Sequence, residues 1–203
     1  MNIRFWGDSA LLVEVQDFRA ARQLREMLLA LAFTGIRELV PGYRSLLIEA
    51  DPLTVDLAEL ARRLPQLTQQ SMLLPAPRQQ EIEVIYDGED LEAVARATGL
   101  AVQEVIRRHA AAHYTVAFLG FAPGFPYLVG LDTTLRVPRL KTPRTRVPAG
   151  SVAIAGEFTG IYPQATPGGW RLLGHTDTCL FNPAQAPPAL LAPGDRVRFR
   201  VRA

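Results

Sequence analysis

Glycine and proline are distributed unevenly along this 203-residue chain. Residues 1–119 contain 5 of the 16 prolines and 5 of the 15 glycines, whereas residues 120–203 contain 11 prolines and 10 glycines. Both residue types interrupt helices and mark tight turns. The first region is therefore predicted to hold longer regular elements, and the second to consist of short strands joined by turns.

The N-terminal part of the chain alternates between extended and helical patterns. Apolar residues recur at helical spacing in two stretches, and short β-prone runs surround them. Thr54 is the expected N-cap of the second helix, and Pro65 is expected to end it. The resulting ββαββα order predicts a small antiparallel sheet backed by two helices. The expected elements are strands 3–6, 11–15, 36–40 and 45–49, and helices 18–32 and 54–64.

Residues 66–80 are rich in glutamine and proline, which is typical of a linker. Two helices are expected soon after it, and beyond them the pattern is β throughout, which argues for a barrel or sandwich. We therefore predict two domains, an α+β domain with its linker at 1–80 and a β-barrel domain at 81–203. The expected elements of the second domain are strands 81–86, 116–119, 152–155, 171–174, 180–182 and 196–202, and helices 90–97 and 102–112.

Charge and cysteine content exclude several classes of protein. The 22 basic and 20 acidic residues leave a net charge of +2, too small an excess to indicate nucleic-acid binding. The single cysteine, Cys179, excludes an intrachain disulfide and a cysteine-rich zinc site. The apolar run 27–33 is far shorter than the roughly 20 residues that cross a bilayer, and no signal peptide is recognisable. We expect a cytoplasmic protein that binds neither membrane nor nucleic acid.

General catalytic motifs are absent from the sequence. Lys141 is the only lysine, and it lacks the glycine-rich context of a P-loop. The segment 120–124 has the spacing of a nucleophile elbow, but Ala122 stands at the nucleophile position. His109 and His113 lie four residues apart on an expected helix, but no third ligand follows at a recognisable spacing. Packing is therefore favoured over a metal site for this pair.

Three unusual stretches carry the candidate chemistry. Residues 118–127 alternate aromatic residues with glycine and proline, which suits either a pocket wall or a buried aromatic cluster. Residues 136–146 hold five basic residues and no acid, which suits carboxylate or phosphate binding or simply a solvated loop. Residues 147–176 combine small residues with hydrogen-bonding side chains. Within them, Glu157 could be an acid or base or a surface residue, and His175 could be a ligand contact or structural.

These stretches resemble one family, which contains the B subunit of bacterial 5-oxoprolinase, the KipI sporulation-kinase inhibitor and the allophanate-hydrolase-subunit-1-like region of urea carboxylase. The resemblance covers essentially the whole chain, and its motifs occur in the same order. The motifs lie at 7–13, 41–47, 118–128, 143–144, 147–152, 159–163, 167–170 and 193–195.

The resemblance implies a fold class and an activity. The fold would be α+β, with a small N-terminal antiparallel α/β sandwich domain followed by a cyclophilin-like β-barrel domain. The activity would be that of one component of an ATP-dependent 5-oxoprolinase, inactive alone, which helps to open 5-oxo-L-proline to L-glutamate. ATP with Mg²⁺ would bind to this chain, to a partner or between them. The partners would be a second protein of the allophanate-hydrolase type (the C subunit of 5-oxoprolinase) and the lactam-opening A subunit.

Other functions remain open at this point. The KipI resemblance implies, as the main alternative, a regulatory inhibitor that binds a sensor histidine kinase. A urea-carboxylase-type role would normally involve fusion to biotin-dependent modules, which this chain is too short to contain. A proline isomerase is suggested only by the cyclophilin-like barrel, and a fold does not carry a function.

Residue chemistry and the matching motifs together give a predicted site on one face of the barrel. Arg144 is expected to bind an anion, and no metal ligand or catalytic residue is assigned. Many relatives carry Gly-Arg-Thr where this chain has Gly174-His175-Thr176, so anion affinity here is expected to be weaker and pH-dependent. The predicted substrate-binding residues are Arg139, Arg144, Ser151, Tyr162, Gln164 and His175, and the predicted pocket wall is Phe125, Tyr127 and Trp170.

Overall fold

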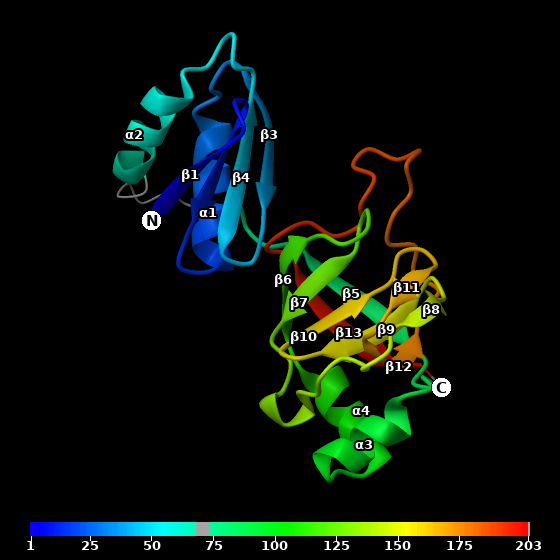
Figure 1. The fold of residues 1–203 in the computed structure, drawn as a ribbon. Helices are drawn as coiled ribbons and strands as arrows, with labels where there is room; N and C mark the ends of the chain where they lie inside the picture. The colour runs from blue at the N-terminus through cyan, green and yellow to red at the C-terminus, as the bar shows by residue number, and fades with distance from the viewer. Residues whose placement is uncertain (68–73, 203) are drawn as a thin grey trace. The chain divides into compact units, whose positions relative to one another are not determined.

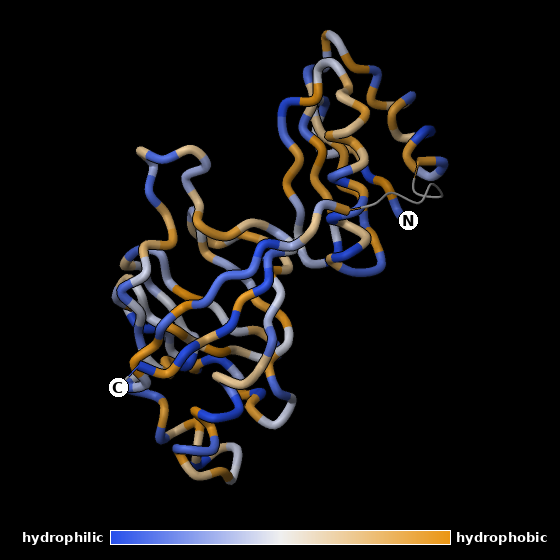
Figure 2. The backbone as a smooth tube through the Cα atoms, turned by 180° about the vertical axis from the view of Figure 1, so that it is seen from behind, coloured by the Kyte–Doolittle hydropathy of each residue, from blue (hydrophilic) through white to orange (hydrophobic). Residues whose placement is uncertain are grey.

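The chain forms two compact units, Met1–Ala76 and Pro77–Ala203, seen in the computed structural model in Figure 1. The structure describes residues 1–67 and 74–202. Part of the predicted linker, residues 68–73, therefore lies outside the described residues. Each unit has a hydrophobic core of its own, and hydrophobic residues recur along the strands of both (Figure 2).

The first unit is a four-stranded antiparallel sheet in the order β1-β2-β4-β3, with two helices. Leu24 and Leu28 of the first helix and Leu60 and Leu64 of the second pack against buried sheet residues such as Ile48. Both helices thus cover the same face of the sheet. The elements are β1 (Asn2–Trp6), β2 (Ala10–Glu14), α1 (Phe18–Ala30), β3 (Ile36–Pro41), β4 (Ser45–Ala50) and α2 (Leu57–Leu67).

Two predictions about the second helix are wrong. The helix begins at Leu57 because the Asp56 carboxylate accepts hydrogen bonds from the amides of Ala58 and Glu59, at 2.9 and 3.1 Å. Asp56 thus has the capping role expected of Thr54. The helix also continues through Pro65 to Leu67. Pro65 is exposed and lies in the last turn, where its missing N–H removes one backbone hydrogen bond and leaves the preceding turns intact.

The second unit contains a seven-stranded sheet that curls into a nearly closed barrel, in the order β12-β9-β10-β7-β6-β13-β5. Ile85, directly after β5, closes the ring by exchanging two 2.9 Å backbone hydrogen bonds with His175 of β12. The elements are β5 (Gln79–Val84), α3 (Leu91–Thr98), α4 (Val102–Ala111), β6 (Tyr114–Leu119), β7 (Pro126–Val129), η1 (Thr133–Leu135), β8 (Arg144–Val147), β9 (Ser151–Ala155), β10 (Phe158–Ile161), β11 (Thr166–Gly168), β12 (Arg171–His175) and β13 (Arg196–Val201).

The predicted α+β fold class is confirmed, although several short strands differ from the sequence prediction. β7, β8, β10 and β11 were not predicted, because each has only three or four residues and most carry glycine or proline. The predicted strand at 180–182 is wrong. Phe181 makes only an isolated bridge to Ala189, because Pro183 ends the extended pattern immediately. β8 and β11 form a separate two-stranded sheet.

Candidate functional site

Strands β9 and β10 are buried on both faces, and this two-sided burial creates the candidate site. Val152 and Ile154 of β9 belong to the interior core of the barrel, whereas Ala153 and Ala155 belong to a separate cluster on the outer face. On β10, a Cβ at Gly160 would lie 2.9 Å from the Phe125 ring. The small residues of the outer face therefore leave the space that aromatic rings occupy.

The aromatic residues predicted as a pocket wall fill that space together. Phe125 meets Tyr162 at 5.1 Å and Trp170 at 5.4 Å between ring centroids, both nearly edge to face. Tyr127 packs against Trp170 at 5.4 Å and is itself half-buried. Phe125, Tyr162 and Trp170 are 1%, 1% and 4% exposed. These rings form a small second core on the outer face, and a ligand would contact its edge and surface.

Phe121 lies on the exposed surface of this cluster, and no local sequence pattern distinguishes it from its aromatic neighbours. It is 62% exposed, and its ring lies edge to face on Phe125 and Tyr162. Its φ of 70° is in the left-handed region, which a phenylalanine seldom adopts. The Ala122 amide donates to the Gly120 carbonyl at 2.8 Å and closes a tight three-residue turn around it. The chain holds an aromatic side chain outward in a strained conformation.

Tyr162 is a buried member of the aromatic cluster, and its hydroxyl lies against Gly168. A Cβ at Gly168 would lie 2.3 Å from the hydroxyl oxygen, so only glycine fits beside it. Burial raises the pKa of Tyr162, and a hydrogen bond with the Trp170 backbone and the nearby charges of Arg139 and Arg144 partly oppose that rise. The hydroxyl is therefore protonated at neutral pH, and it can act as a hydrogen-bond donor.

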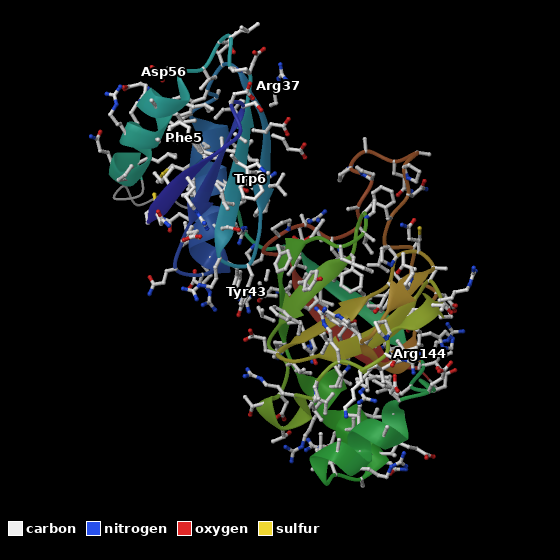
Figure 3. The ribbon with its side chains drawn as sticks, in the orientation of Figure 1. Phe5, Trp6, Arg37, Tyr43, Asp56 and Arg144 are labelled. Atoms are coloured by element: carbon white, nitrogen blue, oxygen red, sulfur yellow. The ribbon has the colours of Figure 1, made fainter. Side chains whose placement is uncertain are left out.

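Arg144, labelled in Figure 3, is bound by acidic residues of its own chain. Its guanidinium donates to Asp90 at 2.9 Å and to Glu89 at 3.2 Å, and it also reaches the Trp170 carbonyl at 3.4 Å. The Asp90 carboxylate is buried and accepts a further hydrogen bond from the Leu172 amide at 2.8 Å. Anion binding by Arg144 remains a prediction, and a ligand anion would have to compete with Asp90 for this side chain.

The same acidic segment, 87–90, binds His175. The Nδ1 atom of His175 lies 2.8 Å from the Asp87 carboxylate, which can only accept, so Nδ1 carries a proton and Nε2 is directed elsewhere. Gly88 allows the segment to press against β12, since a Cβ there would lie 2.4 Å from the Leu172 carbonyl oxygen. This Asp-Gly-Glu-Asp sequence follows a predicted strand, and its acidity is the local signal that could have indicated these contacts.

The other predicted contacts lie at or near the edge of the cluster. Ser151 is buried, pairs in register with His175, and accepts a hydrogen bond from the Tyr162 amide at 2.9 Å through its backbone carbonyl. Arg139 is exposed, and its guanidinium carbon lies 5.8 Å from the centre of the Trp170 ring. No carboxylate within residues 1–67 and 74–202 lies at ion-pair distance from Arg139. Gln164 is exposed between β10 and β11.

His109 lies within α4, but the helix ends at Ala111, so His113 follows it and the expected pair on one helix does not form. His109 is fully buried, and its ring nitrogens bond the Tyr86 hydroxyl at 2.7 Å and the Thr159 hydroxyl at 2.9 Å. Burial lowers the pKa of His109 to about 3. The described part of the chain contains no group of three or more histidine, cysteine or acidic residues that could hold a metal ion. Nor does it include a helix of the length and apolarity needed to cross a membrane.

Comparisons with known proteins place the chain in a family. The model for the carboxyltransferase domain, subdomain C and D, matches residues 1–191. The B subunit of 5-oxoprolinase from Escherichia coli O157:H7 is 42% identical over 207 residues, covering 95% of this chain and 92% of that protein. The protein of the same name from Haemophilus influenzae is 46% identical over 170 residues, covering 82% of this chain and 79% of its own length.

A solved structure agrees with the sequence relatives. The crystal structure of TTHA0988 superposes with a TM-score of 0.85 at 40% identity, and the match covers 96% of this chain. This chain spans only 40% of the TTHA0988 chain, which therefore contains a large additional region. The family predicted from the sequence motifs is confirmed, and the chain belongs to the family of carboxyltransferase-domain subdomains C and D that includes the B subunit of 5-oxoprolinase.

Proposed function

We propose that this chain is the B subunit of an ATP-dependent 5-oxoprolinase, which opens 5-oxo-L-proline to L-glutamate together with partner subunits. The observation that carries the proposal is the 42% identity to a protein named as the B subunit of 5-oxoprolinase, over nearly the full length of both chains. The same relationship supports partners, namely a C subunit of the allophanate-hydrolase type and a lactam-opening A subunit.

The chemistry explains why ATP is needed. An unstrained lactam is a poor electrophile, and transfer of a phosphoryl group from ATP to its oxygen makes the ring carbon open to attack by water. The first water adds to the ring carbon and the ring C–N bond breaks, which leaves a γ-glutamyl phosphate and a free amine. A second water releases phosphate from that acyl phosphate to give glutamate, so the other products are ADP and phosphate. The task of this chain in such a reaction is to bind and orient anionic groups, and arginine and hydroxyl donors suit that task.

Arg139 fits such an anion best, because it is exposed and has no carboxylate partner within the described residues. The Tyr162 hydroxyl is a protonated donor, but its side chain is 1% exposed and would have to be uncovered before it could contact the anion. Ser151, Gln164 and His175 are proposed as further substrate contacts. The sequence has no P-loop, and the described residues form no cluster of metal ligands. We therefore assign the remainder of the Mg²⁺–ATP site to a partner protein.

The test is 5-oxoproline-dependent hydrolysis of ATP in three mixtures. These are the chain alone, the chain with the A and C subunits from the same genome, and the A and C subunits without the chain. Activity confined to the complete mixture is the expected result. Equal activity of the partners without this chain would remove the proposal, and autophosphorylation of a sensor histidine kinase would then be measured for inhibition.

A further inference from the structure

Two segments of the barrel unit carry no charged residue at all. Residues 116–131 and 178–194 comprise 33 residues without aspartate, glutamate, lysine, arginine or histidine. Ten of these 33 residues are exposed, and none of the ten carries a charge; the others are buried or half-buried, where charged residues are seldom found. Depletion of charge together with exposed aromatic residues distinguishes the centre of a protein interface from ordinary surface.

The two uncharged segments contact one another. Gly124, in the loop between β6 and β7, lies against Phe181, and a Cβ at this glycine would be 2.8 Å from the Phe181 Cβ. The segment 181–190 projects from the barrel beside that loop (Figure 1). We name the loop 120–125 and the projecting segment 181–190 together the uncharged surface.

The projecting segment is exposed but held in a fixed shape. Residues 183–188 are all exposed and include three prolines. The Asn182 amide donates to the Pro188 carbonyl at 2.8 Å, and the Leu190 amide donates to the Leu180 carbonyl at 2.9 Å. Within the tip, the Ala184 amide donates to the Asn182 side chain at 3.0 Å. A segment fixed in advance loses little conformational entropy when a partner binds it.

Phe121 supplies the anchor of the uncharged surface. Its ring is 62% exposed although it rests on the aromatic cluster, and its backbone is held in the left-handed region. Such strain persists only where the surrounding structure enforces it, and it is concentrated at functional positions. An exposed, rigidly held aromatic ring within an uncharged surround has the features of an interface hot spot.

We infer that the uncharged surface is the docking site for a companion protein that presents a complementary apolar and uncharged surface. The occupant follows from the relatives, because TTHA0988 carries the region matched here and a further region in a single chain. Where the counterpart of that further region is a separate protein, it is the occupant that we assign to this surface. The inference rests on the proposed function for the presence of such a companion.

The test measures affinity between this chain and the protein from the same genome that corresponds to the additional region of TTHA0988. Phe121→Asn removes the ring while placing a residue that accepts the left-handed conformation, so the variant is expected to fold. Ala184→Glu introduces a charge at the exposed tip. Leu53→Asn, at a position 93% exposed in the first unit, is the matched control. Calorimetric titration gives the dissociation constants, and thermal unfolding verifies that each variant folds.

We expect Phe121→Asn and Ala184→Glu each to weaken binding by about tenfold or more, and Leu53→Asn to leave it unchanged. Hydrogen exchange in the complex should slow in residues 119–125 and 181–190. Absence of association by the parent chain, or binding within twofold of the parent for both variants, would overturn the inference. So would self-association of the parent chain that Phe121→Asn abolishes, because the occupant would then be a second copy.

The binding result is independent of the proposed activity. A complex that forms and responds to the variants, but hydrolyses no ATP with 5-oxoproline, retains the docking site and rejects the activity. A complex that hydrolyses ATP with 5-oxoproline, but binds both variants as tightly as the parent, retains the activity and rejects the docking site.

Discussion

The interior and the outer face of the barrel hold their polar groups in different ways. Inside, the Thr159 hydroxyl donates to the Ala153 carbonyl at 3.0 Å and so accepts from Nε2 of His109, whose Nδ1 accepts from Tyr86. This chain of hydrogen bonds carries no charge. Outside, Arg144 and Asp90 form an ionic pair, and Arg139 remains exposed on Trp170. Fully buried polar groups are thus neutral and hydrogen-bonded to one another, and partly buried charges are paired. Only at the exposed edge is a charge available to a ligand.

The largest expected effect on stability comes from breaking the partly buried pair of Arg144 and Asp90. Arg144→Ala removes the closest cation of the Asp90 carboxylate, 8% exposed, and leaves Arg171 at 3.7 Å, so we expect the loss of stability to approach, at most, the about 3–5 kcal/mol of a broken buried pair. Urea unfolding of the parent and variant measures the loss. Adding Asp90→Asn to Arg144→Ala should recover part of it, because the buried charge that Arg171 alone then faces is removed. A loss below about 1 kcal/mol would show that the outer pair behaves like an exposed one.

The buried hydrogen bonds from Tyr86 through His109 to Thr159 should make the stability of the protein sensitive to acid. Burial lowers the pKa of His109 to about 3 from 6.5, so between these values the unfolded chain binds a proton that the folded chain does not. Stability should therefore fall as the pH falls below 6.5, by up to about 1.4 kcal/mol per pH unit from this group. Unfolding free energies between pH 7 and 5 test this. In His109→Gln, which is expected to be less stable overall, that slope should decrease, and an unchanged slope would contradict the assignment.

A substitution at the exposed edge should lower activity and leave stability nearly unchanged. Arg139→Ala is expected to reduce 5-oxoproline-dependent ATP hydrolysis of the complete assembly about tenfold, since a charged hydrogen bond to an anion is lost. The free energy of unfolding should change by less than about 0.5 kcal/mol. Arg136→Ala, an exposed arginine in the same basic stretch, is the control and should retain full activity. Equal rates in both variants would remove Arg139 from the site.

The smallest effect is expected for the exposed acidic partner of His175. Asp87 and His175 are 57% and 41% exposed, so Asp87→Asn should change stability by less than about 1 kcal/mol despite the 2.8 Å contact. The comparison with Arg144→Ala, measured in the same buffer, separates burial from distance as the cause of the difference. A loss in Asp87→Asn comparable to that in Arg144→Ala would mean that the distance between the paired atoms, and not their burial, sets the contribution of each pair to stability.

Local patterns predicted most of the regular elements, because their signals lie within one segment. The helix 102–112 and the strand 196–202 correspond closely to α4 and β13, where apolar residues recur at the helical or strand period. Competition between neighbouring caps was harder to predict. Asp56 rather than Thr54 caps α2, and both are residue types that favour this position.

The candidate site was less predictable, because its residues are defined by distant partners. Arg144 belongs to a basic stretch in the sequence, but the carboxylate that binds it is 54 residues away. Phe121 reads as one aromatic residue among several, and no local pattern indicates that a phenylalanine adopts φ of 70°. The buried rings of Phe125, Tyr162 and Trp170 were predicted as chemically important without a way to distinguish a wall from a core.

The place of β13 in the sheet has a consequence for synthesis of the protein on the ribosome. β13 lies between β6 and β5, pairing antiparallel with one and parallel with the other. Until residues 196–201 have left the ribosome, β5 and β6 each present an unpaired edge, and the barrel cannot close. The first unit, whose core lies within Met1–Ala76, has no such dependence. During translation the barrel unit is thus the longer exposed to aggregation, and a truncation that removes only β13 would make that exposure permanent.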